Sequence, residues 1–102
     1  MGWNTPVTEF STGGLGLLVP DGDAPTQDDN TNEPYLDFFI ALSKLKNWQI
    51  PNSISISYGE NEQEIPEDYA VIVCELIGVL GARGKSVIVA AGDSGVGDWY
   101  VL

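Results

Sequence analysis

Between residues 32 and 90 the sequence alternates between helical and strand patterns, and this alternation limits the fold more than any other feature. A helical pattern begins at Asn32, and alternating polar and apolar residues then indicate a strand over 53–57. A second helical pattern begins at Pro66, and a short apolar run over 86–90 follows it. Because this order is typical of βαβ units, we predict an α/β fold with a parallel sheet and flanking helices.

The first helix has a recognisable beginning and end. We expect Asn32 to cap it, with Glu33 and Pro34 in its first turn. The pattern breaks at Ile50-Pro51. The predicted buried face consists of Leu36, Phe39, Ile40, Leu42 and Leu45.

The second helix is expected to start at Pro66 and to end near Gly81 and Gly84. The apolar run 86–90 after it is typical of a strand that is covered on both faces of a sheet. The predicted buried stripe of the helix consists of Tyr69, Ile72, Val73, Leu76 and Leu80.

The chain is short enough to be one domain at most, and we divide it into a loop-rich part and a core. Residues 1–31 are predicted to be mostly loop, with one short strand over 15–19, and residues 32–102 form the helix-strand-helix-strand core. The acidic stretch 21–32 is typical of a solvated surface loop. A calcium loop is the alternative, but the glycine and the distal glutamate of an EF-hand are not in place.

Composition excludes several classes of function. The chain has 15 acidic and 4 basic residues, a net charge of −11, so nucleic acid and anionic membrane are not expected as partners. It has no histidine, which removes the usual serine, cysteine and zinc hydrolase templates. Cys74 is its only cysteine, and it is either a core residue or has a partner outside these residues. The beginning of the chain does not have the pattern of a signal peptide, and no apolar run is long enough to span a membrane.

Two glycine-rich segments suggest nucleotide binding but fail on inspection. The segment 81–86 ends like a phosphate-binding loop, yet Val79 stands where the pattern needs glycine. This segment also enters a strand instead of leaving one for a helix. Gly14-Leu15-Gly16 lacks the third glycine of a dinucleotide fingerprint.

The strongest local signal is the segment Gly92-Asp93-Ser94-Gly95, which directly follows an apolar strand pattern. In parallel α/β sheets, ligands and catalytic groups gather at the carboxyl ends of strands, and glycine lets a substrate backbone approach closely. The same letters occur in the nucleophile loop of trypsin-like peptidases. That interpretation fails, because the chain has no histidine base and its pattern is α/β.

An ordered series of motifs resembles the sedolisins, or serine-carboxyl peptidases, in their fungal tripeptidyl-peptidase branch. Order and spacing agree over about 65 to 70 residues. The series consists of Asn32-Glu33-Pro34-Tyr35-Leu36, Ser55-Ile56-Ser57-Tyr58-Gly59, Glu62, Pro66, Tyr69-Ala70, Cys74, Leu80-Gly81-Ala82-Arg83-Gly84, Ser86-Val87 and Gly92-Asp93-Ser94-Gly95-Val96-Gly97. The resemblance implies a partial subtilisin-like fold, in agreement with the predicted sheet.

The resemblance also implies roles for individual residues. Asp93 would help to form the oxyanion hole, where a hydrogen-bond donor stabilises negative charge on the substrate oxygen. An ionised carboxylate cannot donate, so Asp93 must keep its proton when it acts, which ties the chemistry to acid pH. Ser57, Tyr58 and Gly59 would form one wall of the substrate cleft, and Gly92 would let the substrate backbone approach. The alternatives are a helix-capping Asp93 and a simple turn at 57–59.

By the same resemblance the rest of the catalytic set lies elsewhere. The family's Glu/Asp pair belongs to a segment before the Asn-Glu-Pro-Tyr motif, so Glu33 and Asp37, four residues apart, are interpreted as a helix-start charge and a surface acid. The nucleophilic serine belongs to a later Gly-Thr-Ser motif, and Ser94 is not that serine. Calcium would bind in the C-terminal part of the family domain, and no cofactor or metal is expected in this chain.

We therefore predict a piece of a secreted acid peptidase that acts on peptides or proteins by acyl transfer and is inactive alone. The alternative is a non-catalytic α/β module that binds peptides. A urea melt separates the two, since a self-standing module unfolds cooperatively whereas a piece of a larger sheet exposes open edges.

Overall fold

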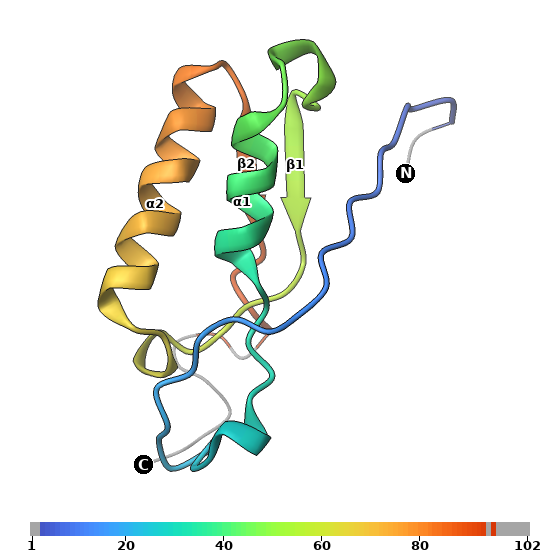
Figure 1. The fold of residues 1–102 in the computed structure, drawn as a ribbon. Coiled ribbons are helices and arrows are strands. Elements are labelled where there is room, and N and C mark those ends of the chain that lie inside the picture. Colours follow the sequence, from blue (N-terminus) through green and yellow to red (C-terminus); the bar gives the residue numbers. More distant parts are fainter. Residues whose placement is uncertain (1–2, 94, 96–102) are drawn as a thin grey trace.

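The computed structural model describes residues 3–93 and residue 95. The order of the main elements is helix, strand, helix, strand, preceded by a long N-terminal segment (Figure 1). The elements are the 3-10 turn η1 (Gln27–Asp29), helix α1 (Tyr35–Lys44), turn η2 (Asn47–Gln49), strand β1 (Ser53–Ile56), turn η3 (Glu62–Glu64), helix α2 (Glu67–Ala82) and strand β2 (Ser86–Val89).

The two strands form a parallel sheet in which α2 makes the crossover connection. Ile54 is opposite Val87, and Ile56 is opposite Val89. Parallel strands need such a crossover, and the α2 helix supplies it with one face packed back on the sheet. The predicted α/β class, with a parallel sheet and flanking helices, is confirmed.

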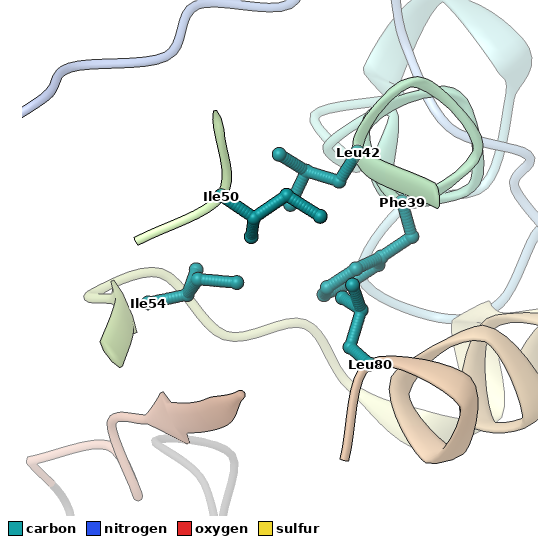
Figure 2. Packing of buried hydrophobic residues seen from close by; sticks show 5 residues of the cluster. All are labelled: Phe39, Leu42, Ile50, Ile54 and Leu80. Carbon is teal, nitrogen blue, oxygen red and sulfur yellow. The ribbon is translucent and has the colours of Figure 1, made fainter. Parts of the chain in front are cut away.

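The core lies between the sheet and the two helices, which both pack on the same face of the sheet. Figure 2 shows its five buried members, which come from α1, the turn before β1, β1 and α2. Phe39, Leu42 and Leu80 are essentially inaccessible to solvent. The five residues are Phe39, Leu42, Ile50, Ile54 and Leu80.

The predicted face of α1 is partly correct. Phe39 and Leu42 are buried as predicted, and Leu45 packs against the core. Leu36 and Ile40 are only half-buried and lie outside the core cluster. Tyr35 and Phe38 pack there instead, because aromatic rings reach the core from positions beside the predicted stripe.

The predicted stripe of α2 has one error. Tyr69 and Leu80 are buried, and the stripe between them packs against the core. Ile72 is 44% exposed, whereas Ile77 takes its place in the packing. Of the two alternatives for Cys74, the core position is excluded, since the thiol is exposed and free among the described residues. Both corrections reflect the single covered face of this helix.

The loop before α1 is held by Asn32, which is buried and does not cap a helix. Its side-chain amide donates to the carbonyl oxygens of Leu17, at 2.9 Å, and Glu64, at 3.4 Å. The amide of Gly16 donates to the Asn32 carbonyl and that of Val19 to the Glu64 carbonyl, both at 2.7 Å. These isolated bonds replace the short strand predicted over 15–19. Asn32 thus ties the N-terminal segment to the turn before α2.

The helices begin close to the predicted positions. Pro34 precedes α1 and Pro66 precedes α2, where a missing amide hydrogen costs nothing. The Leu36 amide, which has no partner within α1, donates to the Tyr69 hydroxyl at 3.0 Å. The beginnings of the two helices are therefore joined by a side chain.

β2 differs from the prediction of a strand covered on both faces. Val87 is half-buried against the core, but Ile88 is 58% and Val89 is 51% exposed. Both helices lie on the face that carries Ile54 and Val87, and Ile88 lies on the other face. None of the helices in the described part of the chain has the length and apolar character needed to cross a membrane.

Candidate functional site

The two segments predicted to bind substrate leave the same edge of the sheet. β1 and β2 run parallel, so their carboxyl ends coincide, and the Ala90 amide extends the pairing by donating to the Ile56 carbonyl at 2.9 Å. Ser57-Tyr58-Gly59 continues from β1 and Gly92-Asp93 follows β2. The structure therefore brings these two segments to one end of the sheet, where α/β proteins hold their ligands.

Tyr58 lies beside a hollow of about 300 Å³ at this end of β1. The hollow is mostly apolar, with Glu33 as its charged member. The Tyr58 carbonyl accepts a hydrogen bond of 2.8 Å from the Tyr35 hydroxyl, which fixes the backbone after β1. Ser57 and Gly59 are exposed on either side. The other lining residues include Phe10, Pro34, Phe38, Ser55 and Ile56.

Gly92 and Asp93 form an exposed turn after β2. Gly92 has φ = +80°, a left-handed conformation that favours glycine over residues with a side chain. Asp93 is exposed, and within the described residues its carboxyl has no hydrogen-bond partner. Ser94 and residues 96–97 of the same motif lie outside the described residues. The side chain of Asp93 is thus available to a ligand at the sheet end.

A second hollow of about 330 Å³ lies on the other side of Tyr58 and is strongly acidic. Asp23, Asp29, Glu60 and Glu64 all line it. Burial raises the pKa of Glu60, and the negative charges of Glu33 and Glu64 add to this, against the effect of the Glu33 amide that donates to the Glu60 carboxylate. This environment becomes less repulsive at acid pH.

Tyr35 is affected by the same charges. Burial, followed by the charges of Glu60 and Glu33, raises the pKa of Tyr35 to about 12. The phenol therefore stays protonated and remains a hydrogen-bond donor to Tyr58. Tyr35 and Glu60 were not predicted as site residues. Their signal in the sequence was the position of Tyr35 in the Asn-Glu-Pro-Tyr motif and of Glu60 next to Gly59.

Glu33 and Asp37 are not on one helical face. Glu33 precedes α1, half-buried, and its carbonyl accepts the Tyr35 amide at 2.8 Å. Asp37 is in the first turn of α1 and is exposed. The expectation of a helix-start position for Glu33 is thus displaced by two residues, because the chain turns at Pro34 before the helix begins.

Carboxylate oxygens of Asp21, Asp23 and Glu64 lie within 4.8 Å of one another. Two of them, Asp21 and Glu64, already have hydrogen-bond partners in their own turns. Asp21 accepts the amides of Asp23, at 2.8 Å, and Ala24, at 3.0 Å, and Glu64 accepts the Asn61 side-chain amide at 2.7 Å. The two backbone bonds lower the pKa of Asp21. These hydrogen bonds shape the acidic loop that was predicted over 21–32.

Known proteins similar to this chain are fungal peptidases. Tripeptidyl-peptidase sed4 of Aspergillus fumigatus is 50% identical over 92 residues, which are 90% of this chain and 16% of that protein. Probable tripeptidyl-peptidase SED3 of Arthroderma benhamiae is 50% identical over 94 residues, 92% of this chain and 16% of that protein. Probable tripeptidyl-peptidase SED2 of Trichophyton verrucosum is 47% identical over 91 residues, 89% of this chain and 15% of that protein.

The match therefore spans about one sixth of the length of these relatives but nearly all of this chain. No family model matches the chain. No solved structure matches it either. Nearly all of this chain is therefore similar to a part of the fungal tripeptidyl-peptidases of the sedolisin family.

Proposed function

We propose that these residues are part of the catalytic domain of a secreted acid peptidase of the serine-carboxyl type, which cleaves peptides by acyl transfer. The observation that carries the proposal is the meeting of Ser57-Tyr58-Gly59 and Gly92-Asp93 at one end of a parallel sheet, in a chain 50% identical to a tripeptidyl-peptidase. Peptide substrates and secretion are expected for the parent enzyme. The family's calcium is assigned to the part of the domain that follows these residues.

In this proposal Asp93 donates a hydrogen bond to the oxyanion. Attack on a peptide carbonyl places negative charge on its oxygen, and one donor aimed at that oxygen is worth about 2.7–4 kcal/mol. Asp93 is a donor only while it carries a proton. Its exposed position after β2 supports the role, because a substrate can reach it without any rearrangement of the core.

The backbone of 57–59 and Gly92 holds the substrate as an extended strand. Tyr35 supports this role, because its hydroxyl fixes the Tyr58 carbonyl and a phenol keeps its proton over the whole acid range. The hollow beside Tyr58 accepts an apolar side chain of the substrate. An extended peptide gains its affinity from such backbone contacts and its specificity from such hollows.

The nucleophile and its activating Glu/Asp pair are assigned to segments outside this chain, so residues 1–102 alone should not turn over a peptide. The decisive experiment replaces the 92 matched residues of Aspergillus fumigatus sed4 with this chain. Asp93→Ala in that graft should lower kcat by about 10²- to 10³-fold. Asp37→Asn is the matched control, since this exposed carboxylate on α1 should leave kcat unchanged.

Two results would contradict the proposal. If Asp37→Asn abolished turnover while Asp93→Ala did not, the catalytic pair would lie within this chain and Asp93 would have no oxyanion role. Peptide cleavage by the pure chain at about pH 4, near the usual carboxyl pKa, would show that the nucleophile is present. Peptide binding without turnover by a graft with intact residues would favour the non-catalytic module.

A further inference from the structure

The hollow beside Tyr58 combines aromatic walls with one negative charge. Phe10, Tyr35 and Phe38 line it, and Glu33 is the charged residue of the set. The rings of Phe10 and Phe38 are in edge-to-face contact, with their centroids 6.3 Å apart. A hollow of about 300 Å³ with this lining has room for one long side chain and selects it by the charge at its end.

No basic side chain in the described part of the chain neutralises Glu33. Figure 1 shows α1 beginning beside the carboxyl end of β1 and both helices ending at the opposite end of the sheet, where the basic residues lie. There the Arg83 guanidinium donates to the Ser43 carbonyl at 3.0 Å, and the Lys85 ammonium donates to the Ile50 carbonyl at 2.8 Å. The four basic residues of the chain are Lys44, Lys46, Arg83 and Lys85.

A second carboxylate adds to the negative charge beside the hollow. The Glu33 amide donates to the Glu60 carboxylate, so the two acidic residues are direct neighbours. Burial raises the pKa of Tyr35 to about 12, and the charges of Glu60 and then Glu33 contribute to this rise. Because Tyr35 is part of the wall, the hollow lies in a negative potential, which attracts a cation.

We propose that this hollow binds a lysine or arginine side chain of the peptide substrate, whose charge is bound by Glu33. The inference rests on the proposed function and deepens it, because the aliphatic stem of such a side chain is the apolar group that the hollow accepts. The stem packs along Phe10 and Phe38, as long basic side chains do on apolar surfaces. The cation at its end meets the Glu33 carboxylate and an aromatic ring.

Other side chains fit this hollow less well. A neutral aliphatic side chain fills the same space but gives the Glu33 carboxylate no partner. An acidic side chain is repelled by Glu33 and Glu60. Glu33 is therefore a specificity-determining residue that takes no part in cleavage of the peptide bond.

The test compares pairs of peptides that differ only by lysine or norleucine at one position, since norleucine has the stem without the charge. Each position is changed in turn, and kcat/KM is measured with the sed4 graft. At one position lysine should be preferred by about tenfold. Glu33→Gln should bring this ratio close to one. Asp37→Asn removes the same charge from an exposed position on α1 and should leave the ratio unchanged.

Two further variants sharpen the result. Glu33→Lys should reverse the preference, so that a glutamate peptide becomes better than its lysine counterpart at the same position. Phe10→Ala removes a wall that both stems contact, so it should lower kcat/KM for lysine and norleucine by similar factors.

The inference is overturned if lysine and norleucine are equivalent at every position, or if the lysine preference survives Glu33→Gln. Failure of the proposed function is a different result, in which Asp93→Ala leaves kcat unchanged or the graft cleaves no peptide. In that case the ratio of the Kd values of the same peptide pairs, measured by calorimetry, tests Glu33 without turnover, and equal Kd values overturn the inference.

Discussion

β1 and β2 lie side by side and pair along their whole length. The burial seen in the structure matches the hydrophobic pattern of β1 but not that of β2. In β1 the alternation of serine and isoleucine matches the structure, with Ile54 buried and Ser53 and Ser55 exposed. In β2 the apolar run has only one covered face, and Ile88 remains 58% exposed. The sequence of β1 is therefore that of a half-buried strand, as the structure shows. β2, by contrast, has the sequence of a strand with two covered faces.

This difference indicates the face of β2 on which we expect contacts with further residues. A strand such as β2 is typical of the centre of a parallel sheet with helices on both sides. We therefore expect the exposed Ile88 to pack against other residues in the peptidase domain that we propose. The following predictions test this comparison from the largest expected effect to the smallest.

Ile54→Ala should have the largest effect on stability. Its side chain is buried in the core cluster, so its removal leaves a cavity between the sheet and the helices, at a cost of about 2–5 kcal/mol. Urea unfolding followed by circular dichroism measures the loss. A cost below that of a surface substitution would show that the core described here is not formed.

Lys85→Met should cost less, about 1–3 kcal/mol. The Lys85 ammonium is buried and donates to the Ile50 carbonyl at 2.8 Å and to the Asn52 side chain at 3.1 Å, which ties the start of β2 to the start of β1. Methionine has a similar shape but leaves the carbonyl unpaired. Lys44→Met, at an exposed position on α1, is the control in the same urea experiment.

Ile88→Thr compares two contexts. In the isolated chain the side chain is exposed, so the change should alter the free energy of unfolding by no more than about 0.5 kcal/mol. In the sed4 graft, where we expect the second face of β2 to be covered, it should cost clearly more, because a hydroxyl is then buried. Equal small effects in both contexts would contradict the interpretation of β2.

Glu60→Gln should have the smallest effect, which appears only as a change in pH dependence. The raised pKa of Glu60 means that the folded chain keeps a proton on this carboxyl where the unfolded chain has lost it. The free energy of unfolding should therefore rise as the pH falls from neutral towards the usual carboxyl range. Glu60 is partly solvated, so this contribution is below about 1 kcal/mol.

The glutamine variant should remove that rise, and Glu62→Gln, at an exposed position in η3, should not. Asp21 acts in the opposite direction, since its pKa is lowered and its stabilising effect is lost on acidification. A comparison of the unfolding curves of the variant and the wild type at matched pH values separates the effect of Glu60 from that of Asp21. An unchanged slope for Glu60→Gln would show that this carboxyl is not coupled to the fold.

Local pattern was enough to predict the order and class of the elements. Pro66 and the serine-isoleucine alternation mark the start of α2 and the course of β1, because both signals are local. The contacts of Asn32 and Ile72 were predicted incorrectly, since they depend on which residues far along the chain cover each face. Asn32 binds Leu17 and Glu64 across the fold, and no local rule identifies such partners.

The same limit applies to the site. The two segments at the sheet end follow from parallel pairing, which the βαβ pattern predicts. The support from Tyr35 to the Tyr58 carbonyl joins residues 23 positions apart and required the structure. The role of Asp93 comes from the family resemblance and stays a prediction until it is measured.

The most direct measurement of the central claim is the pH dependence of kcat/KM for the sed4 graft carrying either Asp93 or Asp93→Asn. Asparagine donates a hydrogen bond at every pH, whereas aspartate donates only when protonated. The ratio of the variant to the wild type cancels every other titrating group that the two share. We predict that this ratio rises as the pH increases through the range in which the aspartate loses its proton. A ratio that is constant with pH would contradict the account.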